Sequence, residues 1–82
     1  MVTLREARVV TDSIVKRLHP LSVILFGSVA RQETGEDLDL LIIVEDTPET
    51  MYDLNVRLGK SLRRFYKRFD IDPFIIRHFL FW

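Results

Sequence analysis

Residues 26–44 read FGSVARQETGEDLDLLIIV. In this stretch Gly27-Ser28 ends one apolar run, and Asp37-Leu38-Asp39 opens another. The backbone N–H groups of a Gly-Ser turn can approach an anion closely, because glycine has no side chain in the way. Two aspartates at positions i and i+2 of a strand point to the same face of a sheet. The stretch therefore predicts two neighbouring strands, with a phosphate-binding turn and a pair of carboxylates where they meet.

The paired carboxylates indicate a metal-assisted reaction. Mg²⁺ prefers hard oxygen ligands and usually binds one or two carboxylates together with substrate phosphates. Asp37 and Asp39 beside a phosphate-binding turn therefore favour nucleotidyl transfer, in which two cations would stabilise the charge that develops on the attacking and leaving oxygens. The alternative is that both are ordinary strand-entry residues, because aspartate is common in turns.

The chain resembles the minimal nucleotidyltransferases of the DNA polymerase beta superfamily. The resemblance rests on Gly-Ser-Val-Ala-Arg at 27–31 followed by Asp-Leu-Asp-Leu at 37–40, and it covers nearly the whole chain. The eight residues from Val29 to Glu36 form a shorter interval than is usual in the family, and Gln32 stands where a glycine usually follows the arginine. The resemblance implies an α/β nucleotidyltransferase-like fold. It also implies transfer of a nucleoside monophosphate, with ATP as the expected donor, to a hydroxyl group.

The resemblance also implies roles for individual residues. Gly27 and Ser28 would hold the triphosphate, and Arg31, one helical turn further on, would reach it. Asp37 and Asp39 would bind two Mg²⁺ ions. The ordinary alternatives are that Ser28 only caps a helix and that Arg31 is a surface residue.

A third carboxylate is expected on the last strand, where the sequence reads Asp70-Ile71-Asp72. Both aspartates would point to one face, so either could serve as a metal ligand or as the general base toward the acceptor hydroxyl. The resemblance favours Asp70, because family members with a proline in this strand tend to carry the aspartate three positions earlier. Asp72 stays open as the alternative.

The resemblance further implies a partner. Stand-alone minimal enzymes resemble the antitoxin halves of two-gene modules, in which the antitoxin adds AMP to a tyrosine of a helical HEPN-type ribonuclease toxin. A different class is also open: a binding module that neutralises its partner by contact, with a weak or vestigial metal site. The tail at residues 79–82, Phe-Leu-Phe-Trp, is predicted to form an interface with a second copy or with the partner, since aromatic residues anchor interfaces. Alternatively, half of the tail caps the core.

Composition bounds the class of protein. The chain has 82 residues, 48% of them hydrophobic, which predicts one small globular domain over 1–82. It has no cysteine, which excludes disulfides and zinc-thiolate sites. No apolar run reaches the roughly 18 residues of a membrane span, and the start is not a signal peptide, so a cytoplasmic protein without membrane contact is expected. Zero net charge argues against stable nucleic-acid binding over the whole surface.

The charges are nevertheless segregated along the chain. Eight acidic residues and no Lys or Arg lie between Glu33 and Asp53, whereas six basic residues and no acid lie between Arg57 and Arg68. A solvated helix face is the ordinary interpretation of such a basic run. The functional interpretation is a patch for a phosphate chain or an acidic partner.

The expected elements alternate helix and strand, at residues 3–19, 21–26, 28–33, 37–44, 47–69 and 70–76. Pro20 stops the first helix, Ser28 caps the second, and Thr47-Pro48 starts the third. Pro73 places the last strand at or near a sheet edge. The predicted fold class is α/β, with a small mixed sheet of at least three strands and helices packed on one face.

Overall fold

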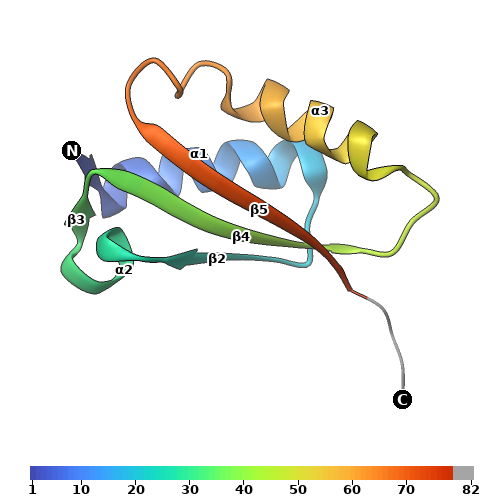
Figure 1. Cartoon of the computed structure of the whole chain (residues 1–82), viewed down its shortest axis with the longest axis horizontal. Coiled ribbons are helices and arrows are strands. Elements are labelled where there is room, and N and C mark those ends of the chain that lie inside the picture. The colour runs from blue at the N-terminus through green and yellow to red at the C-terminus, as the bar shows by residue number, and fades with distance from the viewer. Residues whose placement is uncertain (79–82) are drawn as a thin grey trace.

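The computed structural model describes residues 1–78, and the predicted interface at residues 79–82 lies outside this part of the chain (Figure 1). The elements are, in chain order, β1 (Val2–Thr3), α1 (Leu4–Leu18), β2 (Ser22–Phe26), α2 (Ser28–Gln32), β3 (Thr34–Gly35), β4 (Asp37–Glu45), α3 (Met51–Leu62) and β5 (Asp70–His78). The expected alternation of helix and strand is confirmed, and two short strands, β1 and β3, are added to it.

The main sheet has three strands in the order β2-β4-β5. β2 runs antiparallel to β4, whereas β4 and β5 are parallel and are joined through α3. A separate small sheet pairs β1 with β3 in antiparallel fashion. The mixed sheet and the edge position of the strand that contains Pro73 are thus as predicted.

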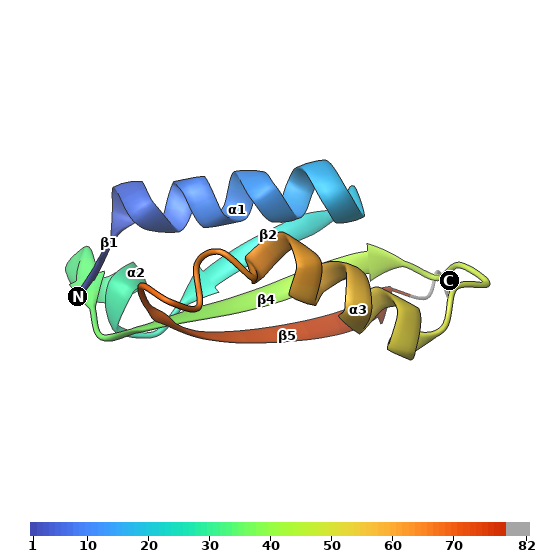
Figure 2. The same cartoon turned by 90° about the horizontal axis from the view of Figure 1, so that it is seen from above.

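Both long helices lie on the same side of the main sheet, and the other face is left open (Figures 1 and 2). β4 alternates accordingly: Leu38, Leu40 and Ile42 have no exposed surface, whereas Asp37 and Asp39 point to the open face. Burying an aliphatic side chain of this size stabilises the fold by about 1.5–3 kcal/mol. The helices and the turns after α3 complete the core with Ala7, Val10, Ile14, Leu18, Leu54, Leu58, Leu62, Phe65 and Phe69.

The first helix has the predicted ends. The Thr3 hydroxyl accepts a hydrogen bond from the Glu6 N–H at 3.2 Å, and the Glu6 carboxylate accepts one from the Thr3 N–H at 3.1 Å. The helix closes at His19, which takes a left-handed conformation just before Pro20. None of the helices within residues 1–78 has both the length and the apolar content that crossing a membrane would require.

The predicted bounds of α3 are wrong at both ends. Thr50, not Thr47, is the N-cap, and its hydroxyl accepts a hydrogen bond from the Asp53 N–H at 3.0 Å. The helix ends at Leu62, and Phe65 and Phe69 lie in the turns that follow it. These turns repeat hydrogen bonds three or four residues apart, from the Phe65 N–H to the Leu62 carbonyl and from the Phe69 N–H to the Phe65 carbonyl. The apolar spacing therefore continues beyond the helix itself.

The connection between β2 and β4 also differs from prediction. Gly27 is the N-cap of α2, so Ser28 is the first helical residue and makes no side-chain cap. The helix closes at Glu33, in a left-handed conformation, before Gly35 is reached. The Glu33 carbonyl accepts a hydrogen bond from the Leu4 N–H at 3.1 Å, which ties this connection to the start of α1. Pairs as short as β1 and β3 carry no periodicity, so the sequence pattern did not predict them.

Candidate active site

The parallel pairing of β4 with β5 gathers four carboxylates at one end of the open face. Asp37 lies opposite Asp70, and Asp39 lies opposite Asp72. Alternation along each strand points all four toward the open face, and neighbouring strands are only about 4.8 Å apart. We call these four residues the acidic cluster. It stands where β4 and β5 begin.

The Gly27 turn lies directly against this cluster. Phe26 pairs with Asp39 across the β2–β4 ladder, so the next residue, Gly27, reaches the side of the Asp39 carboxylate. Gly27 has φ +79°, and a Cβ atom built on it would overlap Asp39 Oδ2. Both the backbone angle and the lack of space require glycine here. The turn and the carboxylate are therefore in contact, as the sequence motif predicts for one site.

Electrostatics connect Asp39 with two other members of the cluster. Loss of hydration, then the negative charges of Asp72 and Asp37 and a hydrogen bond with Asp72, raise the pKa of Asp39 above its ordinary value of 3.8. Arg31 acts in the opposite direction and lowers that pKa. Arg31 is thus near the cluster, but its single positive charge does not balance the carboxylates. The charge around Asp39 is therefore negative on balance.

The two candidates for the third carboxylate stand in different surroundings. Asp72 faces Asp39 across the ladder and is the strongest charge acting on it. Asp70 pairs with Asp37 and lines a neighbouring hollow of about 540 Å³, which Glu36 and Tyr66 also line. The structure therefore brings Asp72, and not Asp70, against Asp39.

The three residues predicted to bind nucleotide are not equivalent in position. Gly27 contacts Asp39, and Arg31 acts on the Asp39 charge. The Ser28 hydroxyl instead lies against Gly35, where an added Cβ would overlap it. Ser28 therefore stands at the turn while its hydroxyl is directed toward the loop that returns to β4.

Tyr66 is a neighbour of the cluster that the sequence analysis missed. Loss of hydration and the charge of Asp72 raise the pKa of the Tyr66 hydroxyl above its ordinary value of 10.0. Tyr66 is 48% exposed and lines the same hollow as Asp70, so its ring is open to solvent at the edge of the cluster. The sequence gives little sign of this role. Tyr66 is an aromatic residue inside the basic run, and the helix predicted there did not indicate that its side chain lies near the aspartates.

Two phenylalanines border the cluster on the open face and were also missed as site residues. The Phe26 and Phe74 rings lie 6.2 Å apart between centroids, on the strands that flank β4. Phe26 pairs with Asp39, and Phe74 follows Asp72 by two residues on the same face. Both side chains are 40% exposed or more. They form an aromatic surface next to the carboxylates.

The carboxylates of the acidic cluster have the chemistry of ligands for a metal ion that binds together with a phosphate-containing substrate. Among residues 1–78, no group of three or more Asp, Glu or His side chains is placed so that it could hold a metal ion by itself. Mg²⁺ does not require one, because it usually keeps water and takes one or two carboxylates with substrate phosphates. Asp39, whose pKa is raised by loss of hydration and then by the charges of Asp72 and Asp37, presents hard oxygen ligands beside the Gly27 turn. These residues fit Mg²⁺ bound together with a triphosphate.

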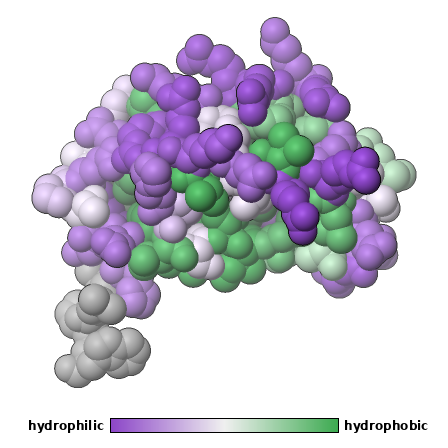
Figure 3. All heavy atoms as spheres, turned by 180° about the vertical axis from the view of Figure 1, so that it is seen from behind, coloured by the Kyte–Doolittle hydropathy of each residue, from purple (hydrophilic) through white to green (hydrophobic). Residues whose placement is uncertain are grey.

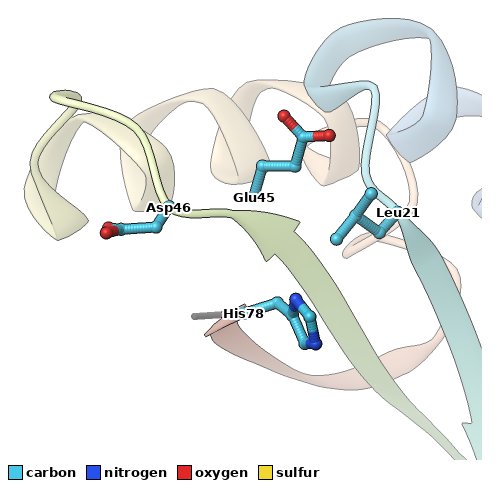
Figure 4. Close-up of a pocket in the computed structure, with 4 residues that line it drawn as sticks. All are labelled: Leu21, Glu45, Asp46 and His78. Atoms are coloured by element: carbon cyan, nitrogen blue, oxygen red, sulfur yellow. The ribbon is translucent and has the colours of Figure 1, made fainter. Parts of the chain in front are cut away.

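A different hollow, of about 520 Å³, lies at the opposite end of the sheet and takes no part in this arrangement. It is lined by Leu21, Glu45, Asp46 and His78, and Figure 4 shows the His78 ring at the end of β5 near Leu21 and Glu45. Glu45 is eight residues beyond Asp37 on β4, or about 26 Å along the strand. This hollow is therefore too far from the acidic cluster to share a small substrate with it.

Comparison with protein families finds a match over most of the chain. The sequence profile described as "Nucleotidyltransferase domain" matches residues 10–78, a range that includes the Gly27 turn and all four members of the acidic cluster. No individually curated protein is similar to the chain.

Proposed function

The chain belongs to the nucleotidyltransferase domain family, and on this premise we propose that it transfers AMP from ATP to a hydroxyl group and releases pyrophosphate. The observation that supports the proposal is the position of Asp39, which contacts the Gly27 turn on one side and meets Asp72 on the other. A phosphate chain held at the turn would lie beside the carboxylates that bind its metal.

We assign the metal ligands to Asp37 and Asp39, and we take Asp72 as the third carboxylate. Asp72 replaces Asp70, which the resemblance favoured, because Asp72 and not Asp70 acts on Asp39. When bound, two Mg²⁺ ions would offset the negative charge of the triphosphate and of the transition state. Asp70 then shapes the neighbouring hollow with Tyr66.

The chain's own residues would position the reactants. The Gly27 backbone approaches the triphosphate, and Arg31 contributes a positive charge beside it. The acceptor oxygen attacks the α-phosphorus, and the bond from the α-phosphorus to the bridging oxygen of the β-phosphate breaks. Asp72 accepts the proton of the acceptor hydroxyl. The products are an AMP ester of the acceptor and pyrophosphate.

We propose a tyrosine of a HEPN-type toxin as the acceptor, which makes the protein an antitoxin. The resemblance supplies this partner. The open face is compatible with it, because Phe26 and Phe74 form an exposed aromatic surface next to the acidic cluster. An incoming tyrosine ring could pack on these rings with its hydroxyl toward Asp72.

A second candidate function is neutralisation of a partner by contact alone. The observation that favours it is the extent of exposed apolar surface on the open face, where Ile24, Phe74 and Ile76 are each more than 40% exposed. Exposed apolar patches on small proteins commonly mark interaction sites. This function does not need the acidic cluster.

The deciding experiment supplies each α-labelled nucleoside triphosphate in turn, with Mg²⁺ and the purified product of the neighbouring gene. We expect label from ATP on a tyrosine of that product, release of pyrophosphate, and no label after chelation of the metal. Binding and neutralisation without label transfer from any of the four nucleotides would establish the contact function instead.

A further inference from the structure

A groove lined by positive charge runs between α1 and the end of α3. Five of the residues that line it are basic, namely Arg17, Lys60, Arg63, Arg64 and Lys67, and no acidic residue lines it. Its volume is about 510 Å³. We call it the basic groove. It belongs to the helix layer and is distinct from the open face that carries the acidic cluster.

The charges of the basic groove are not neutralised by neighbours. The ion pairs within residues 1–78 join Arg57 to Glu49, Arg68 to Glu6 and Arg77 to Asp46. In that part of the chain, none of the five basic residues of the groove has a carboxylate within 4.0 Å, although three other arginines do.

An adjoining hollow does contain one acid, Asp12, beside Arg17 and Arg64. One carboxylate against five cations leaves a net positive field, and like charges in one groove repel each other. Repulsion between these positive charges therefore destabilises the helix layer, and a bound anionic ligand would reduce that repulsion.

The floor of the basic groove is held by hydrogen bonds of the fold itself. The Ser13 hydroxyl on α1 donates to the Ser61 carbonyl on α3 at 2.8 Å, and the Ser61 hydroxyl donates to the Leu58 carbonyl at 2.7 Å. Ser61 is only 3% exposed. The two helices are thus fixed together before any ligand binds. Figure 3 shows hydrophilic side chains covering much of the surface over the helices.

The basic groove continues toward the start of β5. Lys67 lines both this groove and the hollow that Tyr66, Arg68 and Asp70 share. That hollow also holds Glu36 and Asp70, so the positive charge of the basic groove ends there, next to the exposed ring of Tyr66.

We propose that the basic groove binds single-stranded nucleic acid. The five cations are spread over α1, the last turn of α3 and the turns that follow it, so one phosphate can contact only part of the set. A strand with successive phosphates can contact all five cations. Tyr66, 48% exposed and next to Lys67, offers a ring on which a base can stack.

This inference is independent of the proposed catalytic function. It also differs from the expectation that a protein of zero net charge does not bind nucleic acid stably. The net charge is zero because an acidic region and a basic region cancel in the sum. The predicted binding surface is local, and it lies on the helix layer.

The test is fluorescence anisotropy with a labelled single-stranded oligouridylate, without nucleotide or metal. The variant Arg63→Gln/Arg64→Gln removes two charges from the basic groove, and Arg5→Gln/Arg8→Gln removes two exposed charges of α1 that do not line it. We expect the first variant to bind at least about tenfold more weakly and to lower the slope of log K against log salt by about 0.7 per lost phosphate contact. We expect the second to bind like the wild type.

Three results would overturn the proposal: no binding by the wild type, equal weakening by both variants, or competition by polyglutamate as strong as that by unlabelled RNA. The last would make the ligand an acidic polypeptide. Circular dichroism checks that both variants fold. The nucleotide-transfer assay without RNA should be unchanged in Arg63→Gln/Arg64→Gln, which separates failure of this inference from failure of the proposed function.

Discussion

The two faces of strand β4 differ in what they contribute. One face consists of Leu38, Leu40, Ile42 and Val44, all nearly or fully buried under the helices. The other begins with Asp37 and Asp39, whose charges crowd against Asp72 and the Gly27 turn. The buried face therefore stabilises the fold. The open face carries charged carboxylates, which would be costly to bury in the core. Substitutions on adjacent residues should consequently separate stability from activity.

The largest effect is expected on the open face. Asp37→Asn with Asp39→Asn keeps the side-chain size and removes the charge that a divalent cation requires. Loss of one electrostatic group typically reduces a rate by about 10²–10³-fold, so nucleotidyl transfer should fall by several orders of magnitude. Label transfer measures this, with Glu45→Gln on the same face as the control. Wild-type transfer by the double variant would disprove the assignment.

The two aspartates of β5 sharpen the comparison within the open face. Asp72→Asn should approach the loss seen at Asp37 and Asp39, because Asp72 meets Asp39 directly. Asp70→Asn should be mild, since Asp70 lines the neighbouring hollow. Parallel kcat and KM measurements on the two variants decide this. Equal and mild effects would mean that neither aspartate is the third carboxylate.

Adjacent isoleucines test the buried face. Ile42 is 0% exposed, whereas Ile43 is partly exposed on the open face. Ile42→Ala should lower the free energy of unfolding by about 2–5 kcal/mol, because it leaves a cavity in the core. Ile43→Ala should cost clearly less. Urea unfolding of both proteins gives the difference, and equal losses would contradict the one-sided packing.

The smallest effect concerns pH. The raised pKa of Asp39 means that the folded protein holds this proton more tightly than the unfolded chain. The resulting stability is complete below the ordinary pKa and is lost as pH rises through the folded pKa. In metal-free buffer, Asp39→Asn should therefore melt at a higher temperature than the wild type at neutral pH, and the gap should close in acid.

Thermal unfolding across that pH range, with Glu45→Gln alongside, measures the effect. A lower melting temperature for Asp39→Asn at neutral pH would show that the carboxylate is stabilising after all.

The sequence predicted the strands and the shared face of the carboxylates well, because both depend on local alternation. It could not decide between Asp70 and Asp72. They share one face, and only the register of β5 against β4 shows which lies opposite Asp39. Register is a long-range property that spacing within one strand does not determine.

Other misses arose where two local signals competed. Thr47-Pro48 predicted the start of α3, but Thr50, three residues later, is the N-cap, and its hydroxyl accepts a hydrogen bond from the Asp53 N–H. Tyr66 was hidden for a different reason. The apolar spacing continues through the turns after α3, so the sequence predicted a helix there. Tyr66 was therefore assigned to a helix and not to the site that contains Asp72.

The pairing of Phe26 with Asp39 has a consequence for how the motif can vary. The Gly27 turn and the Asp39 carboxylate are brought together by the β2–β4 ladder, although the ten residues from Val29 to Leu38 separate them in sequence. The pairing of β2 with β4, and not the length of the connection, therefore sets the distance between Gly27 and Asp39.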